Sequence, residues 1–460
     1  MSNLLPPANR LLGRVLSLLL FFALFWAISP VSSQTTPLPI LCGNEAFDYI
    51  IRHQYPALHQ AFQSSYEENL QRRSPAVADR SPLTIRVVVH VVWKNPEENL
   101  ADSIIHDQIA VLNEDYNREN ADTANLRSIF QPAAGNPQIR FELAEIVRVQ
   151  TSATFQLNLL GGELMANLKN SSQGGSDAWD PTTYLNLWVC KIQPLSFGGV
   201  TIGQILGFAF PPNNLNHWPA NSGAPSPGQD GVALDFRVIG RNNPNTVEIP
   251  GGTGNLTVRG RTATHEVGHY LGLRHIWGDG GILGLPNDCN QSDGIEDTPF
   301  ANAQSQFDCD KDRNTCNKQE PFYGMDMPDL VENYMDYSRE DCMNMFTRGQ
   351  AGLMLNVLDG PRKGLVQNSS STTQTTPEAQ PMLYPNPARE TVRLRIPAGW
   401  PAINNIDVTG ADGRVQTIQL PVAPGERKID LNVRNWAPGW YAVRLLSATG
   451  TWTQRLVVLP

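Results

Sequence analysis

The chain has little of several features that define common protein classes. Its eight histidines and six cysteines are few for 460 residues, and 35 basic residues are outnumbered by 44 acidic ones, giving a net charge of −9. This acidity argues against a nucleic-acid surface or a surface for anionic membranes. No apolar run beyond the N-terminus is long enough to span a bilayer, so we expect no stable membrane span there. A chain of this length should form two or three folded units.

The one long apolar run lies at the N-terminus and is typical of a secretory signal. Arg10 and Arg14 lead into an apolar stretch at 15–28, which is short for a membrane span, and small residues follow at 31–33. We therefore predict a signal peptide over residues 1–33, with an uncleaved anchor as the alternative. Export also permits disulfide bonds.

The most informative stretch is HEVGHYLGLRH, which begins at His265. His265 and His269 lie four residues apart, so on a helix both imidazoles can reach one ion. Gly272 can adopt a positive φ and end the helix in a sharp turn, which would return His275 as a third ligand. Three imidazoles with one open position form a catalytic zinc site, and Glu266 is placed to act on water there. The alternative is a core helix with incidental histidines.

This motif resembles the extended zinc signature of the metzincin metalloproteases. A metzincin also needs a methionine turn, and residues 333–338 (NYMDYS) supply one in which Met335 should form an apolar floor under the zinc. The flanking residues 260–262 and 297–299 are similar to the pappalysin family, also called ulilysin-like or cytophagalysin, and the resemblance covers about residues 83–365. It implies an α+β catalytic domain with a mixed twisted sheet, helices and an irregular C-terminal subdomain.

The resemblance also implies roles for two residues after the methionine. Tyr337 falls where metzincins often carry a tyrosine that helps to hold the reaction intermediate, and an aromatic that merely packs on the turn is the alternative. Glu340 falls in the region where Arg-preferring members carry an acidic residue. It implies a preference for Arg or Lys on the primed side of the cleaved bond, through a carboxylate–guanidinium pair.

Four cysteines follow the zinc motif, in a segment rich in Asp, Gly and Pro. Their pairing is open from the sequence alone, and the resemblance implies the bonds Cys289–Cys316 and Cys309–Cys342, which would staple a segment of little periodicity.

The same segment offers hard oxygen donors at Asp293, Asp297 and Thr298. Pappalysin relatives bind calcium around this region, so we expect a structural Ca²⁺ ion there. A solvated acidic loop is the alternative.

Residues 34–82 are polar, contain helical stretches and end in arginines that suit a trypsin-like protease, so we interpret them as a pro-segment. Pappalysin-like zymogens often carry a Cys-Gly whose thiolate occupies the fourth zinc position and blocks catalysis. Cys42 and Gly43 provide this pair, although their neighbours depart from the usual motif. A free thiol at Cys42 or a bridge to Cys190 is the alternative, and Cys190 itself reads as a small buried hydrophobe.

Residues 83–366 should hold the catalytic domain. A helix is expected over 102–117, with Asp102 as its N-cap. Strand–helix–strand units before the zinc helix predict a mixed sheet, one short strand of which should lie at the cleft rim and pair with substrate backbone. The strands are expected at 84–92, 139–146, 184–192, 206–210 and 232–236.

A Ser/Thr-rich linker over 367–381 separates a last unit, residues 382–460. Short β runs punctuated by Gly- and Pro-containing turns predict a small antiparallel sandwich. The order YPNP, DVTGADGRV, APGWYAVR and QRLVV is similar to the C-terminal sorting domain of the type IX secretion system. It implies export through the periplasm of a Gram-negative bacterium by secretion machinery, to the medium or the cell surface. A carbohydrate- or protein-binding β module is the alternative.

Together these features predict a secreted endopeptidase that acts on proteins or peptides with one catalytic Zn²⁺, Glu266 serving as general base and then general acid. A secreted adhesin on an inactive protease scaffold is the main alternative, and a zinc amidase is another. The intact histidines and Glu266 argue against an inactive scaffold, because an inactive copy would be free to lose one of them.

Overall fold

The structure is a computed structural model. It describes residues 40–72, 82–158, 163–197, 200–212, 227–248, 254–278, 288–305, 307–367, 381–384, 386, 388–396, 403–410, 414–419, 427–447 and 450–459. The predicted signal peptide and nearly all of the predicted linker lie outside these residues. Among the helices in the described ranges, none has the length and apolar character needed to cross a membrane.

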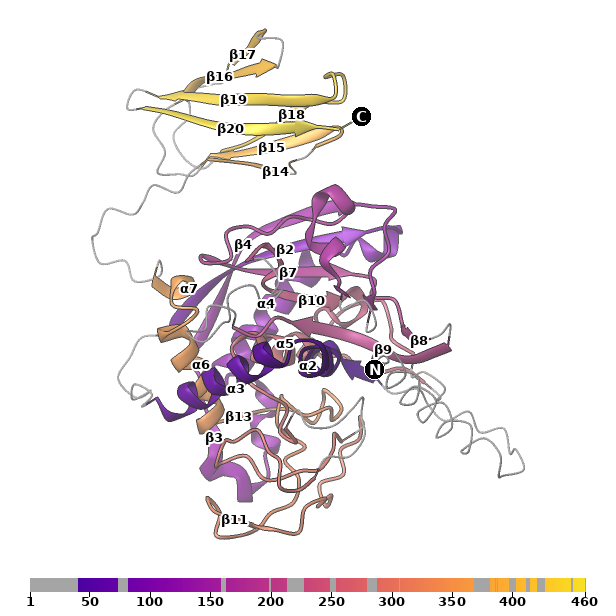
Figure 1. The fold of residues 1–460 in the computed structure, drawn as a ribbon, viewed down its shortest axis with the longest axis vertical. Coiled ribbons are helices and arrows are strands. Elements are labelled where there is room, and N and C mark those ends of the chain that lie inside the picture. The colour runs from indigo at the N-terminus through magenta and orange to yellow at the C-terminus, as the bar shows by residue number, and fades with distance from the viewer. Residues whose placement is uncertain are drawn as a thin grey trace, which may run out of the picture.

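A seven-stranded sheet forms the centre of the catalytic unit (Figure 1). Its strands follow the order β1-β9-β10-β7-β2-β4, with β8 paired to β9 off this path. The parallel pairs are β2 with β4, β2 with β7, β7 with β10 and β1 with β9, whereas β9 runs antiparallel to β10. The bounds are β1 Ile40–Cys42, β2 Leu83–Trp93, β4 Ile139–Gln150, β7 Tyr184–Cys190, β8 Leu195–Phe197, β9 Val200–Ala209 and β10 Val232–Asp235. The sheet is mixed, as predicted.

The central strand β2 explains why its sequence is almost continuously apolar. It is paired on both edges and buried on both faces, so alternating polar residues would have no solvent to face. Helix α4 (Asp102–Tyr116) covers one face with the predicted stripe of Ile105, Ile109, Leu112 and Tyr116. The predicted N-cap was wrong by one position. Ala101 is the N-cap, and Asp102 is the first helical residue, where its carboxylate pairs with Arg148 and still favours the helix dipole.

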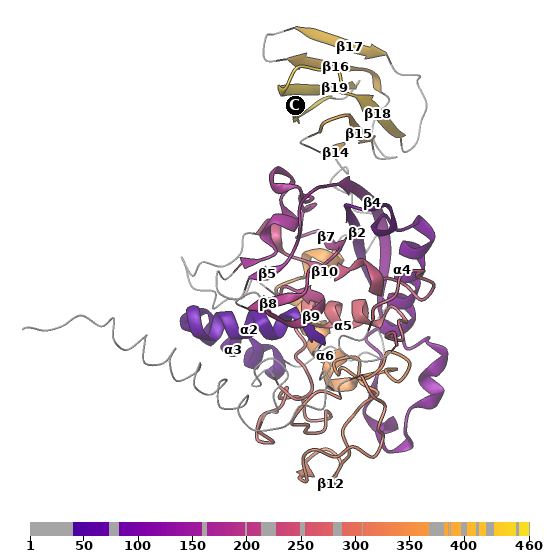
Figure 2. The same ribbon diagram turned by 90° about the vertical axis from the view of Figure 1, so that its right-hand side faces the viewer.

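Four further helices shape the region around the zinc motif (Figures 1 and 2). Helix α5 (Arg261–Tyr270) carries the first part of the motif and packs against β9 and β10. Helices α2 (Gly43–Gln54) and α3 (Pro56–Gln71) come from the predicted pro-segment, and α2 lies against β9 while α3 lies against α6 (Arg348–Asp359). A short helix, α7 (Gly364–Gln367), ends the catalytic unit.

The segment after the zinc motif is irregular, as expected from its composition. Its only strands in the described part are β11 (Gln319–Glu320), β12 (Met325–Asp326) and β13 (Phe346–Thr347), and β13 pairs with β3 (Ala134–Gly135). The structure contains both disulfides that the resemblance implied, Cys289–Cys316 and Cys309–Cys342. A small hairpin elsewhere joins β5 (Leu157–Asn158) to β6 (Glu163–Leu164).

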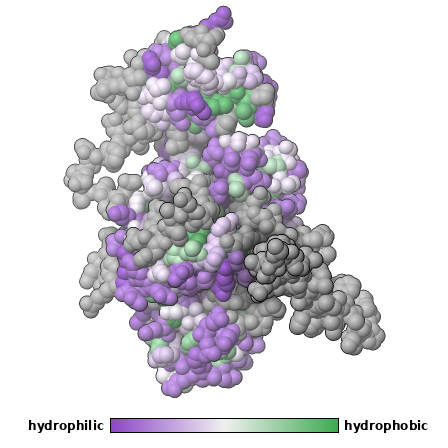
Figure 3. All heavy atoms as spheres, in the orientation of Figure 1, coloured by the Kyte–Doolittle hydropathy of each residue, from purple (hydrophilic) through white to green (hydrophobic). Residues whose placement is uncertain are grey.

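The C-terminal unit is an antiparallel β domain of two sheets, as predicted. One sheet has the order β14-β15-β18 and the other β17-β16-β19-β20. Their bounds are β14 Met382–Tyr384, β15 Thr391–Ile396, β16 Ile403–Gly410, β17 Val415–Gln419, β18 Arg427–Asn432, β19 Gly439–Ser447 and β20 Gly450–Val458. Alternate residues such as Leu394, Ile406 and Val443 fill the core between the sheets. The face drawn in Figure 3 is mainly hydrophilic over the catalytic unit and has a hydrophobic patch on the β domain.

Candidate metal centre and active site

The three histidines of the motif converge on one point. Helix α5 presents His265 and His269 one turn apart, and a turn at Gly272, whose φ is +93°, returns His275 to them. The Nε2 atom of His269 lies 3.0 Å from that of His265 and 3.1 Å from that of His275. All three side chains are buried, and the His275 ring stacks on Trp277 with the centroids 4.4 Å apart.

Hydrogen bonds at the far side of two rings fix their tautomers. His265 Nδ1 donates to Tyr334 O at 2.7 Å, and His269 Nδ1 donates to Leu273 O at 2.9 Å, because a carbonyl oxygen can only accept. The Nε2 lone pairs therefore face one another. Burial and the neighbouring imidazoles hold the pKa of His265 well below its ordinary value, which keeps this ring neutral.

This donor set fits a zinc ion. Neutral imidazoles are preferred zinc ligands, and Zn–N bonds of about 2.0–2.1 Å in a tetrahedron set the nitrogens about 3.3 Å apart, close to the spacing observed. Three converging lone pairs would repel one another without a cation between them. The second-sphere carbonyls of Tyr334 and Leu273 orient the rings as such partners do in zinc sites.

The methionine turn lies against the zinc-binding helix. Met335 is fully buried, and a Cβ placed on Gly268 would lie 2.5 Å from its Sδ atom, so the glycine leaves room for the thioether. The Tyr337 hydroxyl lies 3.2 Å from His275 Nε2, and the Cys42 backbone N–H donates to it at 2.6 Å. The Tyr337 hydroxyl is thus within hydrogen-bonding distance of one motif histidine and of the Cys42 backbone.

Glu266 extends from α5 towards β9. Its side chain is buried, and this burial raises the pKa of its carboxyl to about 8. A Cβ placed on Gly207 of β9 would lie only 2.5 Å from Cγ of Glu266 and 2.6 Å from Oε1. Gly207 could not be recognised from the sequence, because a glycine in a β run carries no signal of what approaches it from another element.

Cys42 lies beside the metal centre. Its Sγ atom and one nitrogen of each motif histidine lie within 4.8 Å of one another, and Sγ is 3.7 Å from Glu266 Oε2. Strand β1 pairs with β9 so that Cys42 stands opposite Gly207. Cys42 and Cys190 are both free and buried, so the alternative of a bridge between them was wrong.

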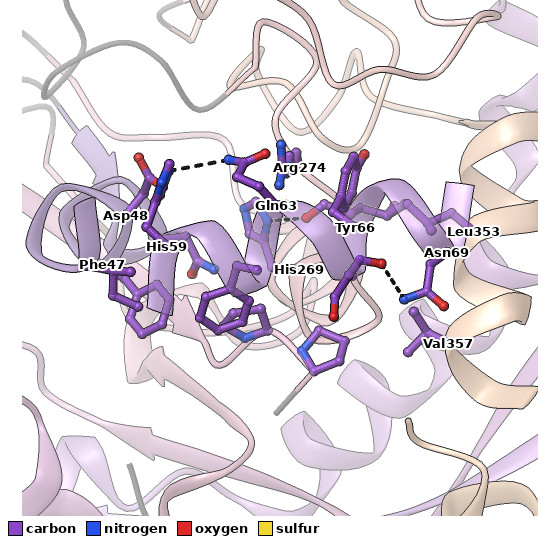
Figure 4. A pocket seen from close by; sticks show the side chains of 18 residues that line it. Phe47, Asp48, His59, Gln63, Tyr66, Asn69, His269, Arg274, Leu353 and Val357 are labelled. Carbon is purple, nitrogen blue, oxygen red and sulfur yellow. Dashed lines mark hydrogen bonds and ion pairs between the residues drawn. The ribbon is translucent and has the colours of Figure 1, made fainter. Parts of the chain in front are cut away.

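Helices α2 and α3 also lie close to the motif histidines. They line a pocket whose other wall includes His269, Arg274 and Val357 (Figure 4). The Tyr66 ring lies under the Arg274 guanidinium, 3.7 Å from ring centroid to Cζ, and its hydroxyl donates to Asp293 O at 2.6 Å. At the end of α3, Asn356 Nδ2 donates to Asn69 O at 2.8 Å.

Glu340 lines a second pocket beside the metal centre, together with Cys42, His265, Glu266 and Tyr337. Its carboxylate accepts hydrogen bonds from the backbone N–H of Thr262 at 2.7 Å, from the Thr262 hydroxyl at 2.6 Å and from the Arg261 N–H at 3.1 Å. These donors belong to the first turn of α5. Glu340 therefore caps helix α5, a role that its sequence context does not indicate.

Asp115 supports the site from behind and was also missed. Its carboxylate accepts from the Tyr334 hydroxyl and from the Thr264 hydroxyl, each at 2.8 Å, and it lies 3.4 Å from the Arg261 guanidinium. Thr264 precedes the first zinc-site histidine, and Tyr334 precedes Met335. Asp115 thus links α4 to the zinc-binding helix and the methionine turn, but its sequence context at the end of α4 gives no signal of this.

The predicted calcium donors Asp293, Asp297 and Thr298 are all buried. Asp297 Oδ2 accepts from Gly349 N at 2.9 Å, whereas Asp297 Oδ1 and Thr298 Oγ1 are buried with no hydrogen-bond partner among the described residues. Burial raises the pKa of the Asp297 carboxyl.

The chain is similar to known proteins in both of its folded units. The family profile described as "Pregnancy-associated plasma protein-A" (Peptidase_M43) matches residues 253–359, and the profile described as "Secretion system C-terminal sorting domain" matches residues 382–459. An extracellular metalloprotease of Arthroderma benhamiae is 28% identical over 295 residues, which cover 64% of this chain and 84% of that protein. Extracellular metalloprotease 1 of Coccidioides posadasii is 29% identical, with 64% and 83% covered.

Solved structures extend the likeness over most of the chain. A Glu→Ala mutant of promirolysin from Tannerella forsythia matches with a TM-score of 0.56 and 33% identity, covering 73% of this chain and 99% of promirolysin. Mature mirolysin of the same organism, in complex with a cleaved peptide, matches with a TM-score of 0.50 and 34% identity, covering 64% and 100%. The chain belongs to the pappalysin-like Peptidase_M43 family of zinc metalloendopeptidases, and it ends in a type IX secretion sorting domain.

Proposed function

We propose that this secreted endopeptidase cleaves peptide bonds with His265, His269 and His275 as its zinc ligands and Glu266 as its proton carrier. The observation that carries the proposal is the position of His269 Nε2, 3.0 Å from His265 Nε2 and 3.1 Å from His275 Nε2, in a site that also holds the buried carboxylate of Glu266. Zinc, when bound, would supply a Lewis acid that acidifies a water molecule and polarises the scissile carbonyl.

The protein's own residues would do the remaining work. Glu266 takes the proton of the attacking water and delivers it to the leaving amine, and the burial of its carboxyl raises its pKa, which favours the form that carries the proton between these two steps. The Tyr337 hydroxyl, 3.2 Å from His275 Nε2, is in reach to donate a hydrogen bond to the oxyanion. Gly207 leaves the space that the Glu266 carboxylate occupies.

Casein hydrolysis by the mature protein tests this mechanism. Glu266→Ala should abolish cleavage while the zinc content stays at one ion per chain, and Tyr337→Phe should lower kcat about 10²-fold or more, as loss of one oxyanion donor does. Activity of Glu266→Ala close to that of the wild type would refute the mechanism. An inactive wild type with a full zinc site would instead favour a binding protein on a protease scaffold. None of the observations above supports that alternative.

We also propose that the chain is made as a zymogen in which residues 34–82 form the pro-segment and Cys42 blocks the metal centre. Support comes from the Sγ position beside the histidine nitrogens and from the pairing of β1 along β9, the strand where a substrate backbone would otherwise pair. Cys42→Ala should release activity in the uncut chain, whereas Cys190→Ala, which removes the other free thiol, should not. Equal latency in both variants would contradict a thiol block.

A preference for Arg or Lys on the primed side is the proposed specificity. Glu340 supports it by lining the pocket beside Glu266 with a buried carboxylate. A peptide-library cleavage profile without basic residues after the cut would refute it.

A structural Ca²⁺ ion at Asp293, Asp297 and Thr298 is proposed as well, supported by the buried oxygens Asp297 Oδ1 and Thr298 Oγ1. A calcium-specific chelator should lower the melting temperature of the zinc-loaded protein, and Asp297→Asn should remove that response. An unchanged melting temperature would contradict the ion.

A further inference from the structure

The β domain contacts the catalytic sheet on the face that α4 does not cover. In Figures 1 and 2, β14 is the strand of the β domain that lies nearest to the catalytic unit. Tyr384 at the end of β14 is buried in one apolar cluster with Val88, Val147 and Trp179 of the catalytic unit. Its ring centroid lies 5.7 Å from that of Trp179 at an angle of 61°.

A buried carboxylate forms the polar part of this contact. Glu145 of β4 accepts a hydrogen bond from the Tyr384 hydroxyl at 2.8 Å and forms an ion pair with Lys428 Nζ at 3.2 Å. Its side chain is only 6% exposed. The pairing of β4 with β2 shifts register beside Glu145, so Ala144 is an extra residue in β4. Such a bulge re-aims the side chains that follow it.

The β domain presents a polar face with a net positive charge, in which Asp430 pairs with Arg393. Tyr384, Arg393 and Lys428 come from β14, β15 and β18, and pairings such as Tyr384 with Arg393 place these side chains on the side of the sheet away from the domain core. Arg395 on the same side lies 6.0 Å from the Trp179 ring centroid. Tyr384, Lys428 and Arg395 of the β domain thus lie against Glu145 and Trp179 of the catalytic unit.

We propose that the face formed by Val88, Glu145, Val147 and Trp179 is a docking surface for the chain's own sorting domain. It recognises Tyr384, the tyrosine of the YPNP sequence that opens that domain. While the two units are docked, this tyrosine is hidden from any other protein. Docking needs the folded catalytic unit. The start of the sorting domain is therefore hidden only when that unit has folded.

A small contact suffices for this because the two units are tethered. Thirteen residues, 368–380, join the two units, and a Gly/Ser-rich linker of that length has a root-mean-square span of about 20 Å. A linker of that kind gives an effective concentration of about 1 mM, so an intrinsic Kd of about 0.1 mM would keep about 90% of molecules docked. Loss of a buried hot-spot tyrosine weakens a contact about thirtyfold or more, which would leave about a quarter docked.

Small-angle X-ray scattering of the full chain tests the proposal, with Glu266→Ala in every variant to prevent self-cleavage. The wild-type arrangement should give one compact particle. Tyr384→Ala and Glu145→Arg should each give a broader ensemble with a larger radius of gyration and faster proteolysis of the linker. Glu142→Arg, at an exposed position on the same strand, is the matched control and should leave scattering unchanged.

A charge exchange separates docking from damage to the fold. Glu145→Lys should undock the domains, and adding Lys428→Glu should restore the compact particle, because the ion pair is re-formed with opposite polarity. Identical scattering for the wild type, Tyr384→Ala and Glu145→Arg would overturn the proposal. A compact dimer whose dissociation with dilution releases the β domain would overturn it too, because the tail would then dock on a second copy.

Discussion

Replacing Gly207 with alanine should disable catalysis while leaving the zinc site intact. The added Cβ would lie 2.5 Å from Glu266 Cγ and 2.6 Å from Oε1. Non-bonded carbon atoms prefer about 3.5–4.0 Å, so the two residues must separate by about 1 Å. Strand β9 pairs with β10 on one edge and cannot retreat without breaking that ladder, so the Glu266 side chain moves instead. A displacement of about 1 Å at a reacting group costs about 10²-fold in rate.

The assay is kcat/KM of the mature enzyme on a fluorogenic peptide, with zinc content and melting temperature measured on the same samples. Gly207→Ala should lower kcat/KM about 10²-fold at one zinc per chain, mostly through kcat. Overpacking of this kind should also lower the free energy of unfolding by about 1–3 kcal/mol. A fall in kcat/KM of less than about threefold with a full zinc site would refute the reasoning.

A double-mutant cycle on stability tests the cause. In the Glu266→Ala background the alanine Cβ at position 207 meets no carboxylate, so Gly207→Ala should cost little or nothing there. The difference between the two backgrounds is the coupling energy of the two sites. If Gly207→Ala lowers the free energy of unfolding equally in both backgrounds, the glycine serves β9 itself and not the catalytic glutamate.

Three further predictions concern stability and zinc affinity. Burial lowers the pKa of His90 from 6.5 to about 4, so the unfolded chain binds the extra proton in that window. When the pH falls from 6.5 to 4, the free energy of unfolding of the wild type should therefore decrease by about 3 kcal/mol more than that of His90→Asn. Urea titration at each pH measures both values. Removing Cys309–Cys342, a bond across 33 residues, should cost about 3–4 kcal/mol in urea unfolding. Asp115→Asn should weaken zinc binding about 10–100-fold in a chelator competition, because Asp115 holds Tyr334 and Thr264.

The zinc motif could be read from the sequence because its information is local. The spacing of His265 and His269 and the turn at Gly272 depend on helix geometry and on one backbone angle, and both follow from residue types. The central strands could also be predicted from their apolar runs. The β domain followed from short β runs that Gly- and Pro-containing turns separate.

Asp115 and Gly207 could not be recognised from the sequence, because their roles depend on contacts with residues that are distant in the sequence. Asp115 acts on residues about 150–220 positions away, and Gly207 matters because of Glu266 on another element. No periodicity or spacing encodes such contacts. Strand β9 was predicted only at 206–210 but runs from Val200 to Ala209, because its glycines lower strand propensity while one of them admits a catalytic side chain.

Glu340 has one role that the family resemblance predicts, substrate selection, and one that only the structure reveals, capping of α5. Substitutions can separate the two roles. The resemblance predicts a carboxylate that selects Arg or Lys, and the structure uses the same carboxylate to cap α5 through Arg261 N and Thr262 N. Glu340→Gln keeps one oxygen as an acceptor for the cap but removes the charge. It should lower kcat/KM for peptides with a primed-side Arg about tenfold or more relative to Leu, with a small change in melting temperature.

Glu340→Ala removes both functions, so it should also lower the melting temperature, by an amount that corresponds to about 1 kcal/mol or more for a lost cap on a buried helix end. If Glu340→Gln instead slows cleavage of Arg and Leu peptides by the same factor, the charge selects no substrate. The carboxylate would then act on catalysis only by holding the first turn of α5, four residues before His265, in place.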